Sequence, residues 1–151
     1  MAMTPALANT LAMISEAASG STDPWWIIGS AAVVLHGRSL AHVKDVDLMM
    51  SAADAEVFLR RVGEEPRNGK PNDRFRSQMF GVWAGPPIPV EVMGGFSIAT
   101  PDGWQEVSLV TRETVTVQGR PVYIPSAEEL VRLLLSFGRA KDLERADLLQ
   151  G

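Results

Sequence analysis

The spacing of apolar residues predicts a helix, a strand and a second helix at the start of the chain. Apolar side chains recur at helical spacing through 4–18, after a Thr-Pro pair that is typical of a helix start. A bulky apolar run at 25–28 fits a buried strand. Gly29-Ser30 separates this run from a helix predicted over 31–36, and 37–42 is typical of a loop.

The middle of the chain predicts two more strands around a helix, and then a further strand. Ser51 is suited to begin the helix, with Asp54 three residues later as a variant of the capping box. Gly94-Gly95 is expected to end the last of these strands. The predicted elements are a strand over 43–50, a helix from Ser51 to Val62, a loop over 63–73, and strands over 75–83 and 88–93.

The last part of the chain predicts short strands and two helices. Period-two alternation marks 107–109, 115–117 and 122–124, and Gln118-Gly119 suits a hairpin tip between the last two. Pro125-Ser126 opens a helix, and Ser126 with Glu129 matches the capping box. Gly138 ends that helix and a final helix follows.

The order of elements predicts a single mixed α/β (α+β) domain over 1–151. No internal repeat or interdomain linker interrupts it. The domain divides into an N-terminal helix at 4–18, a core at 25–124 and C-terminal helices at 126–149.

Composition narrows the class of protein. The chain has 151 residues, 46% of them hydrophobic and 21% charged, which are values typical of a folded domain. It has no cysteine and only two histidines, so zinc–thiolate, iron–sulfur, thiol-nucleophile and multi-histidine metal sites are excluded. The net charge of -4 argues against a protein that coats DNA.

Hydropathy and charge at the N-terminus predict a cytoplasmic protein with no membrane segment. The longest nearly apolar run, Trp25 to Leu35, is too short for a bilayer, which requires about 20 residues. No lysine or arginine precedes Arg38, so the basic region of a signal peptide is missing.

Asp45 and Asp47 are the first candidates for chemistry. Residues two apart in a strand face the same side, so the two carboxylates are expected side by side while Val46 faces the other way. Paired carboxylates repel each other unless a cation compensates, and Mg²⁺ prefers such oxygen ligands. A strand edge with solvated aspartates is the alternative, because Asp-x-Asp alone is a short and common motif.

Gly29-Ser30 and Glu91 extend this candidate site. A turn that leads from a strand into a helix leaves free backbone N–H groups that bind phosphate, although a plain turn with Ser30 as N-cap is the alternative. Glu91 lies in an apolar strand, where an acid is costly unless it is paired, exposed or bound to metal. If that strand lies beside the strand of Asp45, three carboxylates converge; otherwise Glu91 faces solvent at an edge.

Together these segments resemble the nucleotidyltransferase fold. This superfamily contains polymerase-beta-like transferases, antibiotic nucleotidyltransferases and abortive-infection toxins. The ending, with Pro125-Ser126 and then Gly138-Arg139-Ala140-Lys141-Asp142-Leu143, is similar to that of small, uncharacterised bacterial members of the abortive-infection type. The resemblance runs from about Trp25 to Leu149.

The resemblance implies a twisted mixed sheet with the acids on one face and helices packed on the other. It also implies transfer of a nucleoside monophosphate from a nucleoside triphosphate to a hydroxyl acceptor, with release of pyrophosphate. The resemblance does not specify the acceptor, which is a small molecule, a protein or a tRNA. Asp45, Asp47 and Glu91 would bind one or two Mg²⁺ ions, and Glu91 would help to deprotonate the acceptor. The residues implied in nucleotide binding are Gly29, Ser30, Arg38, Lys44 and Lys141.

The sequence also departs from the family pattern. Many small relatives carry an arginine and a threonine before the first aspartate, where this chain has Ala41 and Val43, and an inward lysine where it has Leu134. The alternative function is therefore a catalytically weak or inactive protein that binds nucleotide or acts as a toxin–antitoxin-type interaction module. The nearly minimal domain further predicts a homodimer, or a cognate partner protein, that completes the cleft. Asp-x-Asp phosphatases are disfavoured, because Met49 stands where they need threonine or valine.

Overall fold

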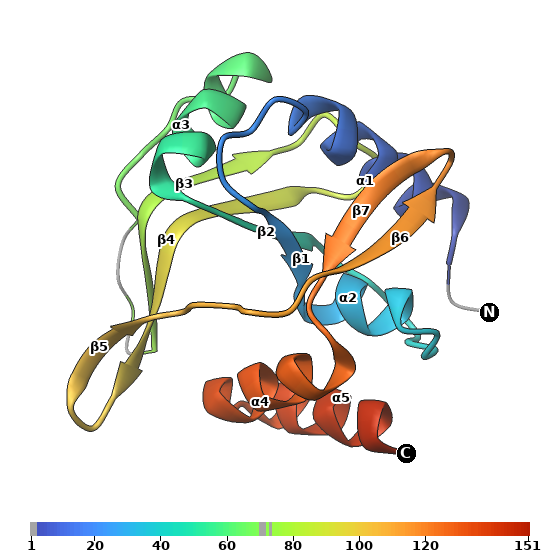
Figure 1. The fold of residues 1–151 in the computed structure, drawn as a ribbon, viewed down its shortest axis with the longest axis vertical. Helices are drawn as coiled ribbons and strands as arrows, with labels where there is room; N and C mark the ends of the chain where they lie inside the picture. The colour runs from blue at the N-terminus through green and yellow to red at the C-terminus, as the bar shows by residue number, and fades with distance from the viewer. Residues whose placement is uncertain (1–2, 70–71, 73) are drawn as a thin grey trace.

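The computed structural model describes residues 3–69, 72 and 74–151. Five helices and seven strands are formed within these residues, and Figure 1 shows their arrangement. Residues 70, 71 and 73 of the predicted loop 63–73 lie outside the described residues. In chain order the elements are α1 (Pro5–Ala17), β1 (Trp26–Ile28), α2 (Gly29–Leu35), β2 (Val46–Met50), α3 (Ala52–Arg61), β3 (Phe75–Trp83), β4 (Val90–Thr100), β5 (Gly103–Glu106), β6 (Glu113–Val117), β7 (Arg120–Ile124), α4 (Ala127–Phe137) and α5 (Ala140–Gln150).

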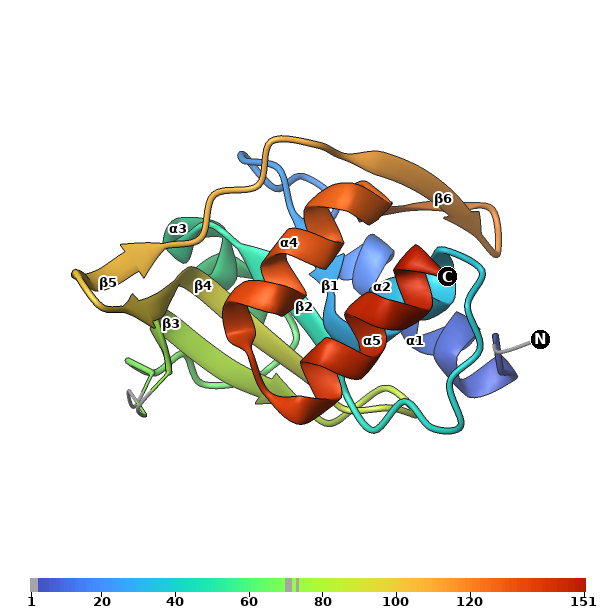
Figure 2. The ribbon, with the colours of Figure 1, turned by 90° about the horizontal axis from the view of Figure 1, so that it is seen from below.

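The main sheet is mixed. Its path is β1-β2-β4-β3, with β5 paired to the far end of β4, while β6 and β7 form a separate hairpin. The pair β2–β4 is parallel and the other pairs are antiparallel. Helices α1 and α3 lie on one side of the sheet, and α4 and α5 lie on the other (Figures 1 and 2). The predicted mixed α/β fold with a mixed sheet is confirmed.

The alternation of apolar and polar residues determines which face of β2 and β4 is buried. Val46 pairs with Val90 and Leu48 pairs with Val92, and all four side chains are fully buried. A Cβ added to Gly94, two residues beyond Val92, would lie 2.6 Å from Ala55 Cβ, so this face of β4 lies directly against α3. The acids at the intervening positions consequently face away from α3.

Four predicted elements differ from the structure. The strand expected over 43–50 begins only at Val46. Strand β4 does not end at Gly94-Gly95 but continues to Thr100, because Gly94 lets α3 approach closely and Gly95 adopts a φ of 63° within the strand. The predicted strand over 107–109 has no strand pairing; β5 forms just before it, at Gly103–Glu106. Helix α2 begins at Gly29, two residues earlier than expected.

Both predicted capping boxes form only in part, because their acids hold loops of other segments. Ser51 and Ser126 accept hydrogen bonds from the backbone N–H groups of Asp54 and Glu129, as expected. The buried Asp54 carboxylate, however, accepts from the N–H groups of Thr22 (3.1 Å) and Asp23 (2.8 Å), which precede β1. The two acids therefore tie loops to the starts of α3 and α4.

The Glu129 carboxylate likewise holds the segment before β6 through hydrogen bonds. Its carboxylate accepts from the N–H groups of Val110 (2.9 Å) and Thr111 (2.8 Å) and from the Thr111 hydroxyl. Burial acts to raise the pKa of Glu129, but these hydrogen bonds outweigh it and hold the pKa below its ordinary value. The charged carboxylate thus stabilises the folded state.

No helix among the described residues is long and apolar enough to cross a membrane.

Glu129→Gln is expected to lower the free energy of unfolding by about 1–3 kcal/mol at pH 7, because buried N–H donors lose a charged acceptor. Since the folded-state pKa is depressed, this contribution is complete above the unfolded pKa of about 4.3 and is lost as pH falls through the folded value. Urea unfolding at pH 7 and below pH 4 measures both effects. The matched control is Glu128→Gln, at the exposed neighbouring position, and equal losses in the two variants would contradict the assignment.

Candidate active site

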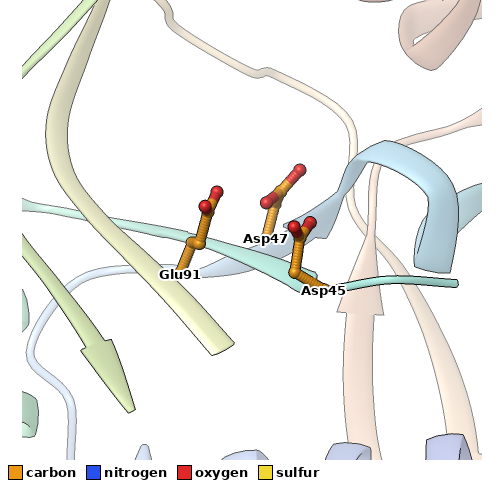
Figure 3. Close-up of side chains that lie close together, drawn as sticks. All are labelled: Asp45, Asp47 and Glu91. Carbon is orange, nitrogen blue, oxygen red and sulfur yellow. The ribbon is translucent and has the colours of Figure 1, made fainter. Parts of the chain in front are cut away.

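Three carboxylates converge on the face of the sheet turned away from α3. Asp45 directly precedes β2, Asp47 lies within it, and Glu91 is the register partner of Asp47 on β4. One oxygen of each carboxylate lies within 4.8 Å of the others, and the three side chains point the same way (Figure 3). The parallel pairing of β2 and β4 is therefore the feature that brings the third acid to the first two.

The electrostatics of Asp47 are unfavourable in the absence of a cation. Its Oδ1 is buried and has no hydrogen-bond partner among the described residues. Burial raises the pKa of Asp47 well above its usual range, and the charges of Glu91 and Asp45 and a hydrogen bond to Glu91 raise it further. Lys141 opposes this rise. Three converging oxygen ligands with an unpartnered buried oxygen fit a hard divalent cation such as Mg²⁺.

Gly29 lies directly against this cluster. It has a φ of 68°, and a Cβ added there would lie 2.5 Å from Asp47 Oδ2. Its neighbour Ile28 pairs with Asp47 across β1 and β2, which fixes the approach. The Gly-Ser turn thus gives the Asp47 carboxylate the space that a side chain would fill.

The structure brings some of the other predicted nucleotide-binding residues toward the acids and not others. Ser30 is buried in the first turn of α2, beside Gly29. Lys141, on α5, lies close enough to influence the pKa of Asp47. Lys44 is exposed next to Asp45, while the Arg38 guanidinium donates to the carbonyl of Leu149 (3.4 Å) at the end of α5.

A cleft of about 500 Å³ opens beside the acids. Asp47 and Glu91 line it, and its aromatic rings and arginines come from the segment before β3, from β3 and β4, and from the end of α4 and the α4–α5 turn. Arg139 also lines the cleft. In the sequence it is noticeable only as part of the motif from Gly138 to Leu143. Its guanidinium binds Asp142 through two hydrogen bonds, of 2.6 and 3.0 Å, and its position depends on how that turn packs.

Solved structures share this architecture. A candidate nucleotidyltransferase from Thermotoga maritima aligns over 98% of this chain and 92% of its own, with a TM-score of 0.78 and 24% identity. The lincosamide antibiotic adenylyltransferase LnuA, bound to lincomycin, aligns over 99% of this chain and 98% of its own (TM-score 0.58, 16% identity). The enzyme ANT(2")-Ia, in complex with adenylyl-2"-tobramycin, aligns over 94% and 86% (TM-score 0.59, 15% identity).

These likenesses identify the class of fold. The chain has the nucleotidyltransferase fold, and the resemblance seen in its sequence is confirmed at that level. No family model and no curated protein sequence matches the chain.

Gly29→Ala tests the close approach of Gly29 to Asp47. Gly37 is the matched control, because it also has a positive φ (86°) but nothing lies within 4 Å of an added Cβ. Gly37→Ala is expected to cost about 1 kcal/mol of unfolding free energy from backbone strain alone. Gly29→Ala is expected to cost at least about 1 kcal/mol more, because its methyl group overlaps the carboxylate. Equal losses in urea unfolding would show that the contact is unimportant.

Proposed function

We propose that the protein is a metal-dependent nucleotidyltransferase that transfers a nucleoside monophosphate from a nucleoside triphosphate to a hydroxyl acceptor. The observation that carries the proposal is the cluster of Asp45, Asp47 and Glu91, with its unpartnered buried oxygen, on the nucleotidyltransferase fold. LnuA and ANT(2")-Ia, which share the fold, are named for antibiotic adenylyl transfer or solved with an adenylylated antibiotic.

Each acidic residue has a role in this proposal. Asp45 and Asp47 hold one or two Mg²⁺ ions, and Glu91 completes the ligand set. When bound, the metal neutralises charge on the attacking and leaving oxygens. Glu91 also accepts the proton of the acceptor hydroxyl, whose oxygen forms a bond to the α-phosphorus while the bond to the bridging oxygen breaks and pyrophosphate leaves.

The residues around the acids bind and orient the nucleotide. Gly29 and Ser30 offer backbone N–H groups to its phosphates at the start of α2. Lys141 adds a positive charge from α5, and Lys44 and Arg38 are further candidates for phosphate contacts. The acceptor is a small molecule, a protein or a tRNA, and a homodimer or a cognate partner protein completes the cleft.

One observation favours a weaker activity as the second candidate function. Leu134, at the position where relatives carry an inward lysine, is fully buried in apolar surroundings, so α4 supplies no phosphate contact there. A protein that has lost such contacts would bind a nucleotide or a cognate toxin–antitoxin partner without efficient transfer.

Nucleotide binding is the first test. Isothermal titration with ATP, GTP, CTP and UTP, each with Mg²⁺, is expected to show binding of at least one. The Asp45→Asn/Asp47→Asn variant is expected to weaken it by about a hundredfold or more, since removing the partner of a buried charge costs about 3–5 kcal/mol. Asp102→Asn, at an exposed turn, is the control and should bind normally. If none of the four nucleotides binds the folded wild type, the transferase proposal fails.

Metal binding is expected to be visible in thermal unfolding. Mn²⁺ or Mg²⁺ at a hundred times its Kd should raise the Tm of the wild type by about 5–10 °C. Asp47→Asn should lose this response yet be at least as stable without metal, because one of three mutually repelling carboxylates is gone. A variant destabilised without metal, with its metal response intact, would instead indicate a structural role for Asp47.

A further inference from the structure

Most of the residues that line the cleft lie on one side of the acids. Across the sheet, Ile28 pairs with Asp47, Asp47 pairs with Glu91, and Glu91 pairs with Val82 on β3. The Gly-Ser turn is therefore at the β1 side of the row, where Ile28 is the one described residue of β1 that lines the cleft, and the cleft residues contributed by β3 are at the Glu91 side. If the nucleotide phosphates occupy the first side, the cleft receives the group that reacts next to Glu91.

Aromatic rings form one wall of the cleft. Phe75, Phe96 and Phe137 pack against one another with centroid separations of 5.1–5.9 Å, although they come from β3, β4 and α4. Arg139 lies over the Phe75 ring at 5.0 Å, and its own charge is balanced by Asp142. Phe96 and Phe137 are largely buried, so this wall offers ring edges and the partly exposed Phe75, an apolar surface that suits an aromatic ring packed edge to face.

Two further arginines line the cleft and bring positive charge to it. Arg67 is fixed at the edge of β3 by two backbone hydrogen bonds with Phe80, of 3.0 and 2.7 Å. Arg76 lies over the Trp104 ring at 4.8 Å. Neither has a carboxylate of a described residue within 4.0 Å, and the described acids lining the cleft are Asp47 and Glu91, two of the three proposed metal ligands. Such a cleft disfavours a cation and favours an anion.

From these observations we propose that the cleft binds the acceptor, and that the acceptor carries a flat apolar ring and a negatively charged group as well as its hydroxyl. The proposal rests on the proposed function. The ring packs against the phenylalanine wall and the anion binds Arg67 and Arg76. The hydroxyl oxygen is then directed toward the acids, where it forms the bond to the α-phosphorus, gives its proton to Glu91 and displaces pyrophosphate.

Three matched probes test the charge of the acceptor. Each carries a 4-hydroxyphenyl ring: 3-(4-hydroxyphenyl)propanoate is anionic, its amide is neutral and tyramine is cationic. Isothermal titration of the wild type is expected to show the propanoate binding about tenfold more tightly than the amide, the increment of one charge-assisted hydrogen bond. Tyramine should bind most weakly. Equal affinities, tightest binding of tyramine, or no binding of any probe would overturn the proposal.

Single variants test whether the arginines cause this preference. Arg67→Gln and Arg76→Gln should each remove most of the preference for the propanoate over the amide while leaving the affinity for the amide unchanged. Arg60→Gln, an exposed arginine on α3 outside the cleft, should keep the full preference. A preference that survives in both cleft variants would overturn the proposal.

A nucleotide titration of the same variants separates the acceptor from the nucleotide. The triphosphate that binds the wild type should bind Arg67→Gln and Arg76→Gln equally well, and it should not displace the propanoate. Loss of triphosphate binding in these variants, or displacement of the probe, would assign the cleft to the nucleotide and overturn the proposal. Failure of the proposed function would be seen differently, as no triphosphate binding even to the wild type.

Discussion

The Asp47 carboxylate is held between two other carboxylates and a glycine, and the geometry of the candidate site depends on this arrangement. The β2–β4 register places Glu91 opposite Asp47, and the positive φ of Gly29 leaves room for Asp47 Oδ2 on the other side. Two neighbouring carboxylates beside the buried, unpartnered oxygen of Asp47 are costly in the absence of a cation. A divalent cation held by the three carboxylates would offset this cost, which is why the proposed function places the metal here.

The scaffold keeps this cluster in place by tying distant loops to helix starts. Asp54 fixes the loop before β1, whose last residue leads into Gly29. Glu129 fixes the segment before β6 to the start of α4, the helix whose end contributes Phe137 to the cleft. In both cases a serine supplies the helix cap, which leaves the acid free to bind the loop.

The sequence could predict what local patterns determine. The alternation in Val46–Met50 fixes which side chains share a face, so the pairing of Asp45 with Asp47 follows from the strand alone. The place of Glu91 depends on a parallel neighbour more than forty residues away, which no local pattern specifies. The Gly94-Gly95 pair is locally typical of a strand end. In the structure the strand runs on, because Gly94 allows close packing against α3. Arg139 reaches the cleft only through the packing of the α4–α5 turn, and its sequence neighbourhood does not reveal this.

The proposed function requires that Asp45, Asp47 and Glu91 together hold a divalent cation next to a nucleoside triphosphate. A crystal grown with Mn²⁺ and a non-hydrolysable triphosphate, measured at the manganese absorption edge, tests this most directly. The expected result is an anomalous peak next to oxygens of all three carboxylates and of the triphosphate, with the phosphates at the Gly29 side. A triphosphate bound elsewhere, or bound at this site with no manganese peak among the three carboxylates, would contradict it.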